Sequence, residues 1–332
     1  MVFLGSGWGK LLLFGEHAAV YGHPAVGLSL NTALRVQLRP GEEVGWKIQG
    51  VREEDREPIL RILDLLDELS GGEGEHHRAG LNSRWSGGRL TLESRIPRGL
   101  GFGSSASLCV ALATAVAARK GVRDPGRIWE WAHRAEALFH GTPSGIDTGL
   151  ALLGGLYSFS PHPPRLPEAE PLAGVPLHLV VGAVPRRQRA GALIGALREK
   201  VLGEDGQVVE ILERLGGLAR ESCDILRLPP KGESAESAAR KLGRQAGKAQ
   251  ELLSRLGLST PELDRLLQEG RDRGALGGKL SGAGGGGAFF LVCSDTRTAA
   301  GVAAGLQQLS RSLKLATAET IYSLSWRPEG SG

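Results

Sequence analysis

Hydrophobic positions recur along this chain with two different periods, and the periods predict both helices and strands. Residues 55–70 (DREPILRILDLLDELS) place isoleucine and leucine at helical spacing, whereas residues 89–96 (RLTLESRI) alternate as a half-exposed strand does. Three short apolar runs, at 10–14, 177–185 and 286–294, are typical of buried strands. This mixture predicts an α+β protein.

Further helices are predicted where capping residues bracket periodic segments. They cover 104–121, 124–141, a long stretch over 191–257 that breaks at 227–234 (RLPPKGES), 258–270 with Ser259 or Thr260 as N-cap, and 296–313. Prolines gather between Ser158 and Pro176, which predicts a linker there. We therefore expect two domains, at 1–165 and 175–332, and we see no internal repeat.

Composition narrows the class of protein. The 332 residues suffice for two domains, and 40 basic against 36 acidic residues leave a net charge of +4. Few aromatic residues interleave with basic ones, so we expect no nucleic-acid partner. The N-terminus lacks the features of a signal peptide, and no apolar run is long enough to span a bilayer. Three widely spaced cysteines predict buried thiols in a cytoplasmic protein without membrane contact.

The segment Ile96–Leu108 (IPRGLGFGSSASL) poses the sharpest question, because three alternating glycines precede an alanine-rich apolar run. Glycine clusters mark backbone that bends tightly or approaches something closely. A glycine loop that leads into a helix presents free N–H groups and the positive end of the helix dipole, which suits a phosphate. An ordinary turn is the alternative. A second cluster lies at Lys279–Val292 (KLSGAGGGGAFFLV), where a flexible loop between domains is the alternative.

Two familiar phosphate-binding patterns can be tested against these loops. A Walker A loop around Gly9–Lys10 fails, because Leu4 stands where glycine is required and Leu11 where Ser or Thr would hold magnesium. The dinucleotide pattern does fit three positions, Gly101, Gly103 and Ala106. It also requires an acidic residue after a second strand, and Asp124 follows a predicted helix instead. A dinucleotide oxidoreductase is therefore a distant alternative.

Taken together, several segments resemble the GHMP kinases and, within them, the mevalonate kinases. The similar segments run in order from about residue 5 to 295: Gly9–Gly27, the phosphate loop Pro97–Ser107, 136–155 (EALFHGTPSGIDTGLALLGG), 252–267, and Lys279–Ala288. The resemblance implies a GHMP kinase fold, with an N-terminal α/β domain, a ferredoxin-like C-terminal domain, and ATP and the second substrate between them. It implies transfer of the ATP γ-phosphoryl group to the C5 hydroxyl of mevalonate.

The resemblance also implies roles for individual residues. Asp147 matches the catalytic base, and Lys10 matches the lysine beside it that stabilises the incipient alkoxide. Ser105 and Glu136 match the pair that holds Mg²⁺. The ATP phosphates are expected to lie along the loop that comprises Gly99, Leu100, Gly101, Phe102, Gly103, Ser104, Ser105 and Ala106. Each of these carries an ordinary alternative, such as a turn aspartate, a solvated lysine or a surface carboxylate.

The expected substrate contacts are Glu16, His17, Gly284 and Arg186, the last suited to a carboxylate by its two parallel N–H donors. Gln188 departs from the family, which usually has threonine there, so the identity of the substrate is less well supported than the chemistry. A GHMP-type kinase for phosphomevalonate, homoserine or a sugar-like alcohol is one alternative. A non-catalytic nucleotide-binding member is another. A homodimer is one option for assembly.

Overall fold

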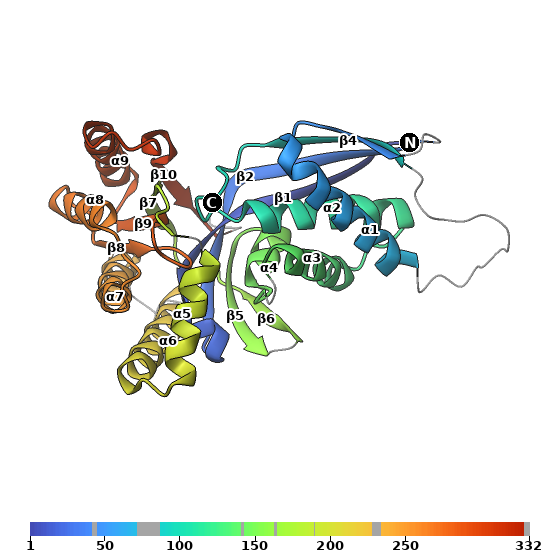
Figure 1. The fold of residues 1–332 in the computed structure, drawn as a ribbon. Helices are drawn as coiled ribbons and strands as arrows, with labels where there is room; N and C mark the ends of the chain where they lie inside the picture. Colours follow the sequence, from blue (N-terminus) through green and yellow to red (C-terminus); the bar gives the residue numbers. More distant parts are fainter. Residues whose placement is uncertain are drawn as a thin grey trace. The chain divides into compact units, whose positions relative to one another are not determined.

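The computed structural model describes residues 1–41, 45–71, 87–140, 143–162, 165–188, 190–227 and 234–328 (Figure 1). The chain divides into two compact units. Unit 1 comprises 1–10, 29–96 and 103–154, and unit 2 comprises 11–28, 97–102 and 155–332. The limits predicted from the sequence, 1–165 and 175–332, differ from these units chiefly because two long early strands contribute residues to both.

Unit 1 contains a mixed sheet and helices α1 to α4. Its strands are β1 (Phe3–Phe14), β2 (Ala25–Pro40), β3 (Gly45–Gln49) and β4 (Gly87–Ser94), and its helices are α1 (Arg56–Gly71), α2 (Ser104–Lys120), α3 (Pro125–His140) and α4 (Ile146–Leu153), with a short 3₁₀ turn, η2 (Glu53–Asp55). β4 pairs in parallel with β3 and antiparallel with residues 34–40 of β2, and β1 pairs with β2. Helices α1, α2 and α3 lie together along the sheet (Figure 1).

The glycines of β1 explain how α2 packs directly onto this strand. A Cβ on Gly5 would lie 1.9 Å from the Ala111 carbonyl oxygen, and one on Gly7 would lie 2.2 Å from that of Ser107. Only glycine permits such contact between backbones. The Ser107 hydroxyl lies 2.6 Å from the Trp8 carbonyl oxygen, so it also joins the helix to the strand. This contact fixes the beginning of α2 relative to Lys10.

Unit 2 contains a β-hairpin and an α+β body. Its elements, in chain order, are η1 (Ala18–Tyr21), β5 (Leu156–His162), β6 (Arg165–Pro171), β7 (Leu177–Val184), α5 (Ala190–Leu202), α6 (Gly206–Arg227), α7 (Ala235–Arg255), α8 (Pro261–Asp272), β8 (Gly277–Leu280), β9 (Gly287–Cys293), α9 (Thr296–Ser312), η3 (Ala318–Thr320) and β10 (Tyr322–Trp326). The second sheet has the order β10-β7-β9-β8 with every neighbouring pair antiparallel. Numbered along the chain, these strands lie in the order 4-1-3-2, which is the ferredoxin-like arrangement.

A continuous apolar core holds unit 2 together. Leucine, isoleucine and valine side chains from α6 to α9 pack with those of β7, β8 and β9, and members such as Leu253, Leu263, Leu291 and Val302 are fully buried. Each fully buried aliphatic side chain of this size contributes about 1.5–3 kcal/mol. The sheet strands are therefore a rigid base for the loops at their ends.

The sequence prediction of a linker over 158–176 was wrong. Residues in this range form β5 and β6, which pair with each other, while β5 also pairs with residues 25–28 of β2. Two of the described prolines illustrate positions that a strand tolerates. Pro161 lies at an irregularity of register between Ser160 and His162, and Pro171 ends β6, which is the last strand in its sheet order. The predicted breaks at 228–233 and the loop over 72–80 lie outside the described residues.

Candidate functional site

A lysine–aspartate pair forms the centre of the candidate site in unit 1. Lys10 Nζ lies 3.0 Å from Asp147 Oδ2, and the two side chains are 5 % and 37 % exposed. The sequence placed Asp147 in a loop, but it lies in the first turn of α4, which begins after Gly145. Thr148 Oγ1 and Trp129 Nε1 both donate to the Gly145 carbonyl oxygen and fix this helix start. The aspartate therefore combines a fixed position with an open side to solvent.

Gly103 connects this pair to the predicted phosphate loop. It is the N-cap of α2, with φ of 79°, and α2 has no side-chain cap. A Cβ at Gly103 would lie 2.6 Å from Lys10 Cγ, so the lysine side chain passes against this glycine. The first hydrogen bond within α2 runs from Ser107 N–H to the Gly103 carbonyl oxygen, so the N–H groups of Ser104, Ser105 and Ala106 have no partner within the helix. These N–H groups lie beside Lys10, and together they suit an anion.

Glu136 is a buried carboxyl group close to the same pair. It lies on α3 and is 2 % exposed, and its Oε2 has no hydrogen-bond partner among the described residues. Burial and, after it, the Asp147 charge raise the pKa of Glu136 to about 8, although Lys10 opposes the shift. The carboxyl group is therefore mostly protonated at neutral pH, and a divalent cation bound at its Oε2 would displace that proton.

Ser105, the other predicted metal ligand, contacts the end of α3. Its Oγ lies 3.1 Å from Nε2 of His140. No group of three or more His, Cys, Asp or Glu side chains placed to hold a metal occurs in the described part of the chain. Mg²⁺ does not need such a group in kinases, because it keeps several waters and is bound by one or two protein oxygens plus phosphates. The donors Ser105 and Glu136 fit that chemistry.

In unit 2, Arg186 lies against two of the glycines that the sequence analysis singled out. A Cβ on Gly101 would lie 2.9 Å from Arg186 Nη2, and one on Gly287 would lie 2.8 Å from its Nε. Both glycines have positive φ, as has Gly99, whose Cβ position is open. The alternating positions are therefore glycine for different reasons. Gly101 leaves room for the Arg186 guanidinium group, and Gly103 leaves room for the Lys10 side chain. The chain passes from unit 2 to unit 1 between Phe102 and Gly103.

Glu16 and His17 lie in unit 2 beside the second glycine cluster. The Glu16 carboxylate pairs with Lys279, and the two side chains are 1 % and 0 % exposed. His17 Nε2 lies 3.2 Å from the Ala283 carbonyl oxygen. Burial, and to a lesser extent the Lys279 charge, lower the pKa of His17 to about 4, although the carbonyl contact opposes the shift. The imidazole is therefore neutral at physiological pH.

The second glycine cluster is an ordered turn between β8 and β9, not a flexible loop between domains. Gly285 N–H donates to the Leu258 carbonyl oxygen at 2.8 Å, and Arg187 N–H donates to the Gly285 carbonyl oxygen at 2.9 Å. Gly284 has φ of 84°, and a Cβ there would lie 2.6 Å from the Leu258 carbonyl oxygen. Close backbone approach accounts for this glycine, and its role toward a substrate stays a prediction.

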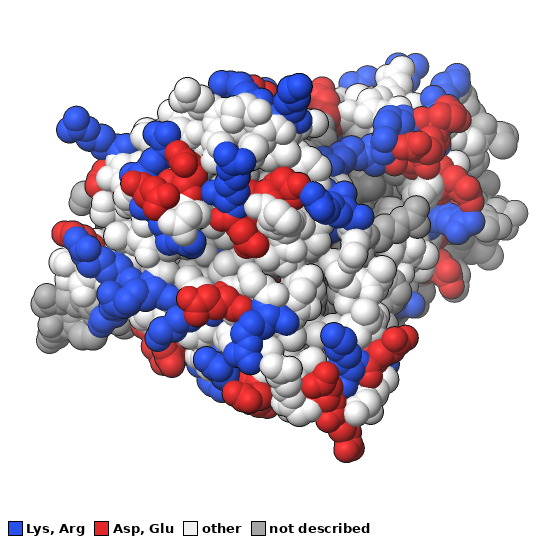
Figure 2. Space-filling view, turned by 60° about the vertical axis from the view of Figure 1, so that its left-hand side comes forward, with Lys and Arg blue, Asp and Glu red and all other residues white. Residues whose placement is uncertain are grey.

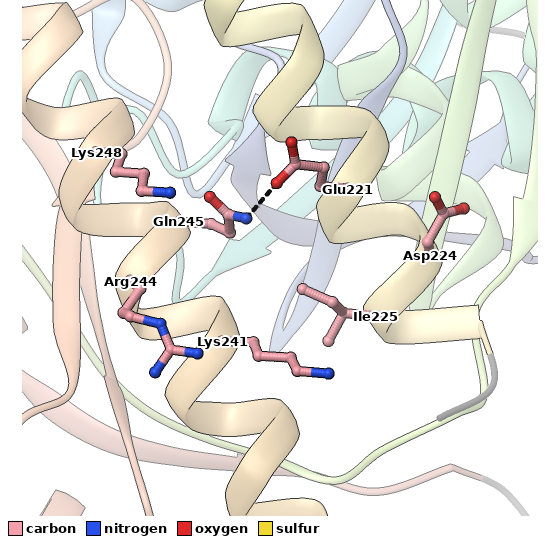
Figure 3. A pocket seen from close by; sticks show the side chains of 7 residues that line it. All are labelled: Glu221, Asp224, Ile225, Lys241, Arg244, Gln245 and Lys248. Atoms are coloured by element: carbon pink, nitrogen blue, oxygen red, sulfur yellow. Dashed lines mark hydrogen bonds between the residues drawn. The ribbon is translucent and has the colours of Figure 1, made fainter. Parts of the chain in front are cut away.

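A separate cavity of about 290 Å³ lies elsewhere in unit 2. It is lined by residues of α6 and α7, namely Glu221, Asp224, Ile225, Lys241, Arg244, Gln245 and Lys248 (Figure 3). Gln245 donates a hydrogen bond to Glu221 across it. Figure 2 shows acidic and basic side chains interspersed over the visible face, in keeping with the small net charge. None of the predicted catalytic or substrate-binding residues lines this cavity.

Two residues of interest were not assigned by the sequence analysis. His140 follows Glu136 at helical spacing of four, which places both on one face of α3 and could have drawn attention to it. Lys279 begins the second glycine segment and lies in β8, whose four residues are all buried. Burial of a lysine without a partner is costly, so this position requires a partner, but the burial is visible only in the structure.

Comparison with known proteins places this fold in a family of enzymes. Residues 59–155 match the family model of the GHMP kinases N-terminal domain, and residues 231–311 match that of the GHMP kinases C-terminal domain. The chain belongs to the GHMP kinases.

Within this family, several relatives that are similar in sequence are named mevalonate kinase. The mevalonate kinase of Thermococcus gammatolerans is 30 % identical over 335 residues, covering 93 % of this chain and 96 % of the relative. That of Methanothermobacter thermautotrophicus is 32 % identical over 289 residues, covering 86 % and 88 %. The solved structure of L. major mevalonate kinase in complex with R-mevalonate has a TM-score of 0.78, at 22 % identity and 99 % and 97 % coverage. This structural likeness confirms the predicted GHMP kinase fold.

Two further expectations can be compared with the structure. Within the described ranges, no helix combines the length and apolar character needed to cross a bilayer. The three cysteines, Cys109, Cys223 and Cys293, are free and buried, as the sequence predicted. Burial raises the pKa of the Cys223 thiol to about 11 and that of Cys293 to about 12, so these thiols are poor nucleophiles at neutral pH.

Proposed function

We propose that this chain transfers the γ-phosphoryl group of ATP to the C5 hydroxyl of mevalonate and so forms 5-phosphomevalonate and ADP. The observation that carries the proposal is the Lys10–Asp147 pair, at 3.0 Å, beside the uncapped beginning of α2. Two relatives at 30 % and 32 % identity, matched over nearly their whole length, are named mevalonate kinase, and this supports the choice of substrate.

The proposed chemistry uses Asp147 as the base. Its carboxylate, 37 % exposed, would accept the proton of the substrate hydroxyl as that oxygen attacks the γ-phosphorus and the bond to ADP breaks. Lys10 would stabilise the negative charge that develops on the attacking oxygen. Its burial strengthens this effect, because water screens the ammonium charge poorly there.

The phosphates of ATP would be bound by backbone N–H groups along Gly99–Ala106, with those of Ser104 to Ala106 at the beginning of α2. Mg²⁺ would be held by Ser105 and Glu136, whose buried Oε2 has no hydrogen-bond partner among the described residues. When bound, the cation neutralises charge on the phosphates and reduces the repulsion that the nucleophile meets. His140 Nε2 would accept a hydrogen bond from the Ser105 hydroxyl group, which leaves a lone pair of that oxygen for the cation.

On the substrate side, Arg186 would bind the carboxylate of mevalonate, and His17 and Gly284 would lie against the rest of the molecule. Arg186 has the geometry for two parallel hydrogen bonds to a carboxylate. Gln188 N lies 3.9 Å from the Cβ position of Gly285, so this departure from the family is a neighbour of the glycine turn. A cytoplasmic location and a homodimer complete the proposal.

The test is a coupled assay of ADP release with purified protein, Mg²⁺ and a panel of alcohols. We expect turnover with R-mevalonate to exceed that with phosphomevalonate, homoserine or galactose by at least about two orders of magnitude, since sites that hydrogen-bond their substrate discriminate strongly. Turnover of another alcohol instead of mevalonate would leave a GHMP-type kinase of different specificity. Nucleotide binding without any turnover would point to a non-catalytic member.

A further inference from the structure

The backbone at His17 adopts a strained conformation. Its φ is 60° and its ψ is −43°, and the N–H of Ala18 donates to the carbonyl oxygen of Glu16 at 2.6 Å. A hydrogen bond across three residues with positive φ at the central one defines a rare type of γ-turn. A residue keeps such a conformation only where its surroundings fix it from several sides. The surroundings of this turn therefore indicate what it is for.

Lys279 fixes the first residue of the turn. Its ammonium group donates to the Glu16 carboxylate, to the Leu280 carbonyl oxygen at 2.7 Å and to the Leu13 carbonyl oxygen at 3.2 Å. An ammonium group has three donors, so these bonds satisfy all of them. The rings of Phe14 and Phe290 lie 5.9 and 5.4 Å from Nζ and exclude water. The Glu16 side chain is thereby held in one position.

The glycine turn fixes the central residue. A carbonyl oxygen can only accept a hydrogen bond, so the contact between His17 Nε2 and the Ala283 oxygen, at 3.2 Å, requires the proton on Nε2. The ring is neutral because burial holds the pKa of His17 near 4. Nδ1 then keeps its lone pair and is a hydrogen-bond acceptor. The turn thus presents one acceptor atom, in one tautomer, from a rigid base.

We propose that Lys279 and Glu16 are positioning residues, which hold the γ-turn at His17 so that Nδ1 accepts a hydrogen bond from a hydroxyl group of the substrate. Glu16 itself does not touch the substrate in this proposal, since its carboxylate is 1 % exposed and is bound by Lys279. The inference rests on the proposed function, and it replaces the direct substrate contact that the sequence suggested for Glu16.

A double-mutant cycle tests the coupling. Glu16→Gln keeps the shape of the side chain and removes its charge, and His17→Gly removes the acceptor while adopting positive φ without strain. We expect each single variant to raise KM for mevalonate about tenfold, the equivalent of one lost hydrogen bond, with kcat within about threefold and KM for ATP unchanged. In the His17→Gly background, Glu16→Gln should have no further effect on KM. Additive effects would overturn the proposal.

Two controls separate positioning from stability. Ser281→Ala removes a different bond between the same two segments, in which the Leu12 N–H donates to Ser281 Oγ at 2.9 Å, so it should lower the melting temperature and leave KM unchanged. Replacing both members of the ion pair, by Glu16→Met with Lys279→Met, should recover stability that either single replacement loses. KM should stay raised in this double variant. Recovery of KM together with stability would mean that the pair is merely structural.

Failure of the proposed function would be recognised separately. If the wild-type protein does not phosphorylate mevalonate, KM for mevalonate cannot be measured. The tautomer of His17 can still be observed by ¹⁵N NMR of the free protein. We expect the wild type to show a single Nε2–H tautomer at His17 and Glu16→Gln to show exchange between tautomers. A single unchanged tautomer in Glu16→Gln would contradict the positioning role whatever the substrate is.

Discussion

Two lysine–carboxylate pairs that share the same chemistry, Lys10 with Asp147 and Lys279 with Glu16, lie in different surroundings. In unit 1, Lys10 and Asp147 are 3.0 Å apart, and the aspartate is 37 % exposed. In unit 2, Lys279 and Glu16 are 0 % and 1 % exposed. A carboxylate that must exchange a proton with a substrate needs an open side, whereas a carboxylate that fixes a turn is better enclosed. Exposure therefore separates a pair suited to reaction from a pair suited to support.

The same difference decides what each pair contributes to stability. In the Lys10–Asp147 pair only the aspartate keeps contact with water, and that contact keeps the contribution of the pair to stability small. Both charges of an enclosed pair have lost their hydration, so removing one partner leaves an uncompensated buried charge and costs about 3–5 kcal/mol. Loss of Asp147 should thus affect the reaction, and loss of Glu16 should affect folding and positioning. Each prediction below tests one side of this comparison.

The largest effect is expected from Asp147→Asn. Asparagine keeps the size of the side chain but cannot accept the hydroxyl proton, and general base catalysis contributes up to about 10⁴-fold. We expect kcat to fall by about 10³-fold or more, while the Kd for ATP stays close to wild type and the melting temperature falls only modestly, because Glu136 remains beside the buried Lys10. Steady-state kinetics, nucleotide titration and thermal unfolding provide the three measurements. Equal turnover by both proteins would falsify the assignment of the base.

Lys10→Met should have the next largest effect. The substitution removes a charge directed at the reacting oxygen, and loss of one such electrostatic contact costs about 10²–10³-fold in kcat. Asp147 keeps access to water, so its charge is not stranded and the free energy of unfolding should change by less than about 1 kcal/mol. Lys279→Met is the matched comparison, with a large loss of stability expected. If Lys10→Met destabilises the protein as strongly as Lys279→Met, exposure is not what distinguishes the pairs.

Local patterns predicted most of the elements of this fold. Helices α1, α2, α3, α8 and α9 and strands β4, β7 and β9 lie close to the segments that periodicity and capping indicated. Thr260 is the N-cap of α8, and its Oγ1 accepts a hydrogen bond from Leu263 N–H. Strands β5 and β6 were missed, because prolines in the sequence do not reveal whether a strand is at the edge of a sheet. That property depends on pairing between distant segments.

The candidate site was predictable in its residue types and not in its contacts. The motifs indicated Lys10, Asp147 and Glu136, but only the fold explains why Gly101 and Gly103 must both be glycine. One accommodates an arginine 85 positions later, and the other accommodates a lysine 93 positions earlier. The pairing of Glu16 with Lys279 spans 263 positions and was likewise invisible locally. The roles of the residues could be assigned from the resemblance to a family. The reasons for the two glycines and for the Glu16–Lys279 pair became visible only in the three-dimensional structure.

Gly103→Ala tests whether the N-cap glycine of α2 positions Lys10 of the Lys10–Asp147 pair. Its effect on kcat should be smaller than those of Asp147→Asn and Lys10→Met. Both Gly103 and Gly121 have positive φ, at 79° and 73°, and they cap opposite ends of α2. Alanine at either position costs about 1–2 kcal/mol of stability from backbone strain. Only at Gly103 would the added Cβ meet Lys10 Cγ, at 2.6 Å, whereas nothing lies within 4 Å at Gly121. We expect Gly103→Ala to lose at least as much stability as Gly121→Ala, and only Gly103→Ala to lose about tenfold in kcat.

The comparison between Gly103→Ala and Gly121→Ala removes the contribution of strain. Unfolding by urea measures the stability of each variant, and steady-state kinetics at saturating ATP measures kcat. A loss of kcat in both variants would mean that the helix as a whole responds, and Lys10 would then not depend on the N-cap glycine.

The smallest effect is expected in the pH dependence of stability, through the titration of His17 beside the Lys279–Glu16 pair. The folded-state pKa of His17 is about 4, against an ordinary value of 6.5 in the unfolded chain, because the ring is buried and faces the Lys279 ammonium group. Between these values the unfolded chain binds more protons than the folded protein. The free energy of unfolding should therefore fall as pH decreases through this range, by at most about 1.4 kcal/mol for each pH unit.

His17→Asn isolates that contribution, since it removes the titrating ring and tolerates the positive φ of the turn. Other groups also titrate in this range, so the informative quantity is the difference between wild type and variant in urea unfolding at pH 6 and pH 5. We expect the wild type to lose more stability over this step than the variant does, by up to about 1.4 kcal/mol. Equal losses would show that His17 accepts a proton in the folded protein as readily as in the unfolded chain. A protonated ring would have no acceptor at Nδ1, so the same result would weaken the role that enclosure by Lys279 and Glu16 gives to this turn.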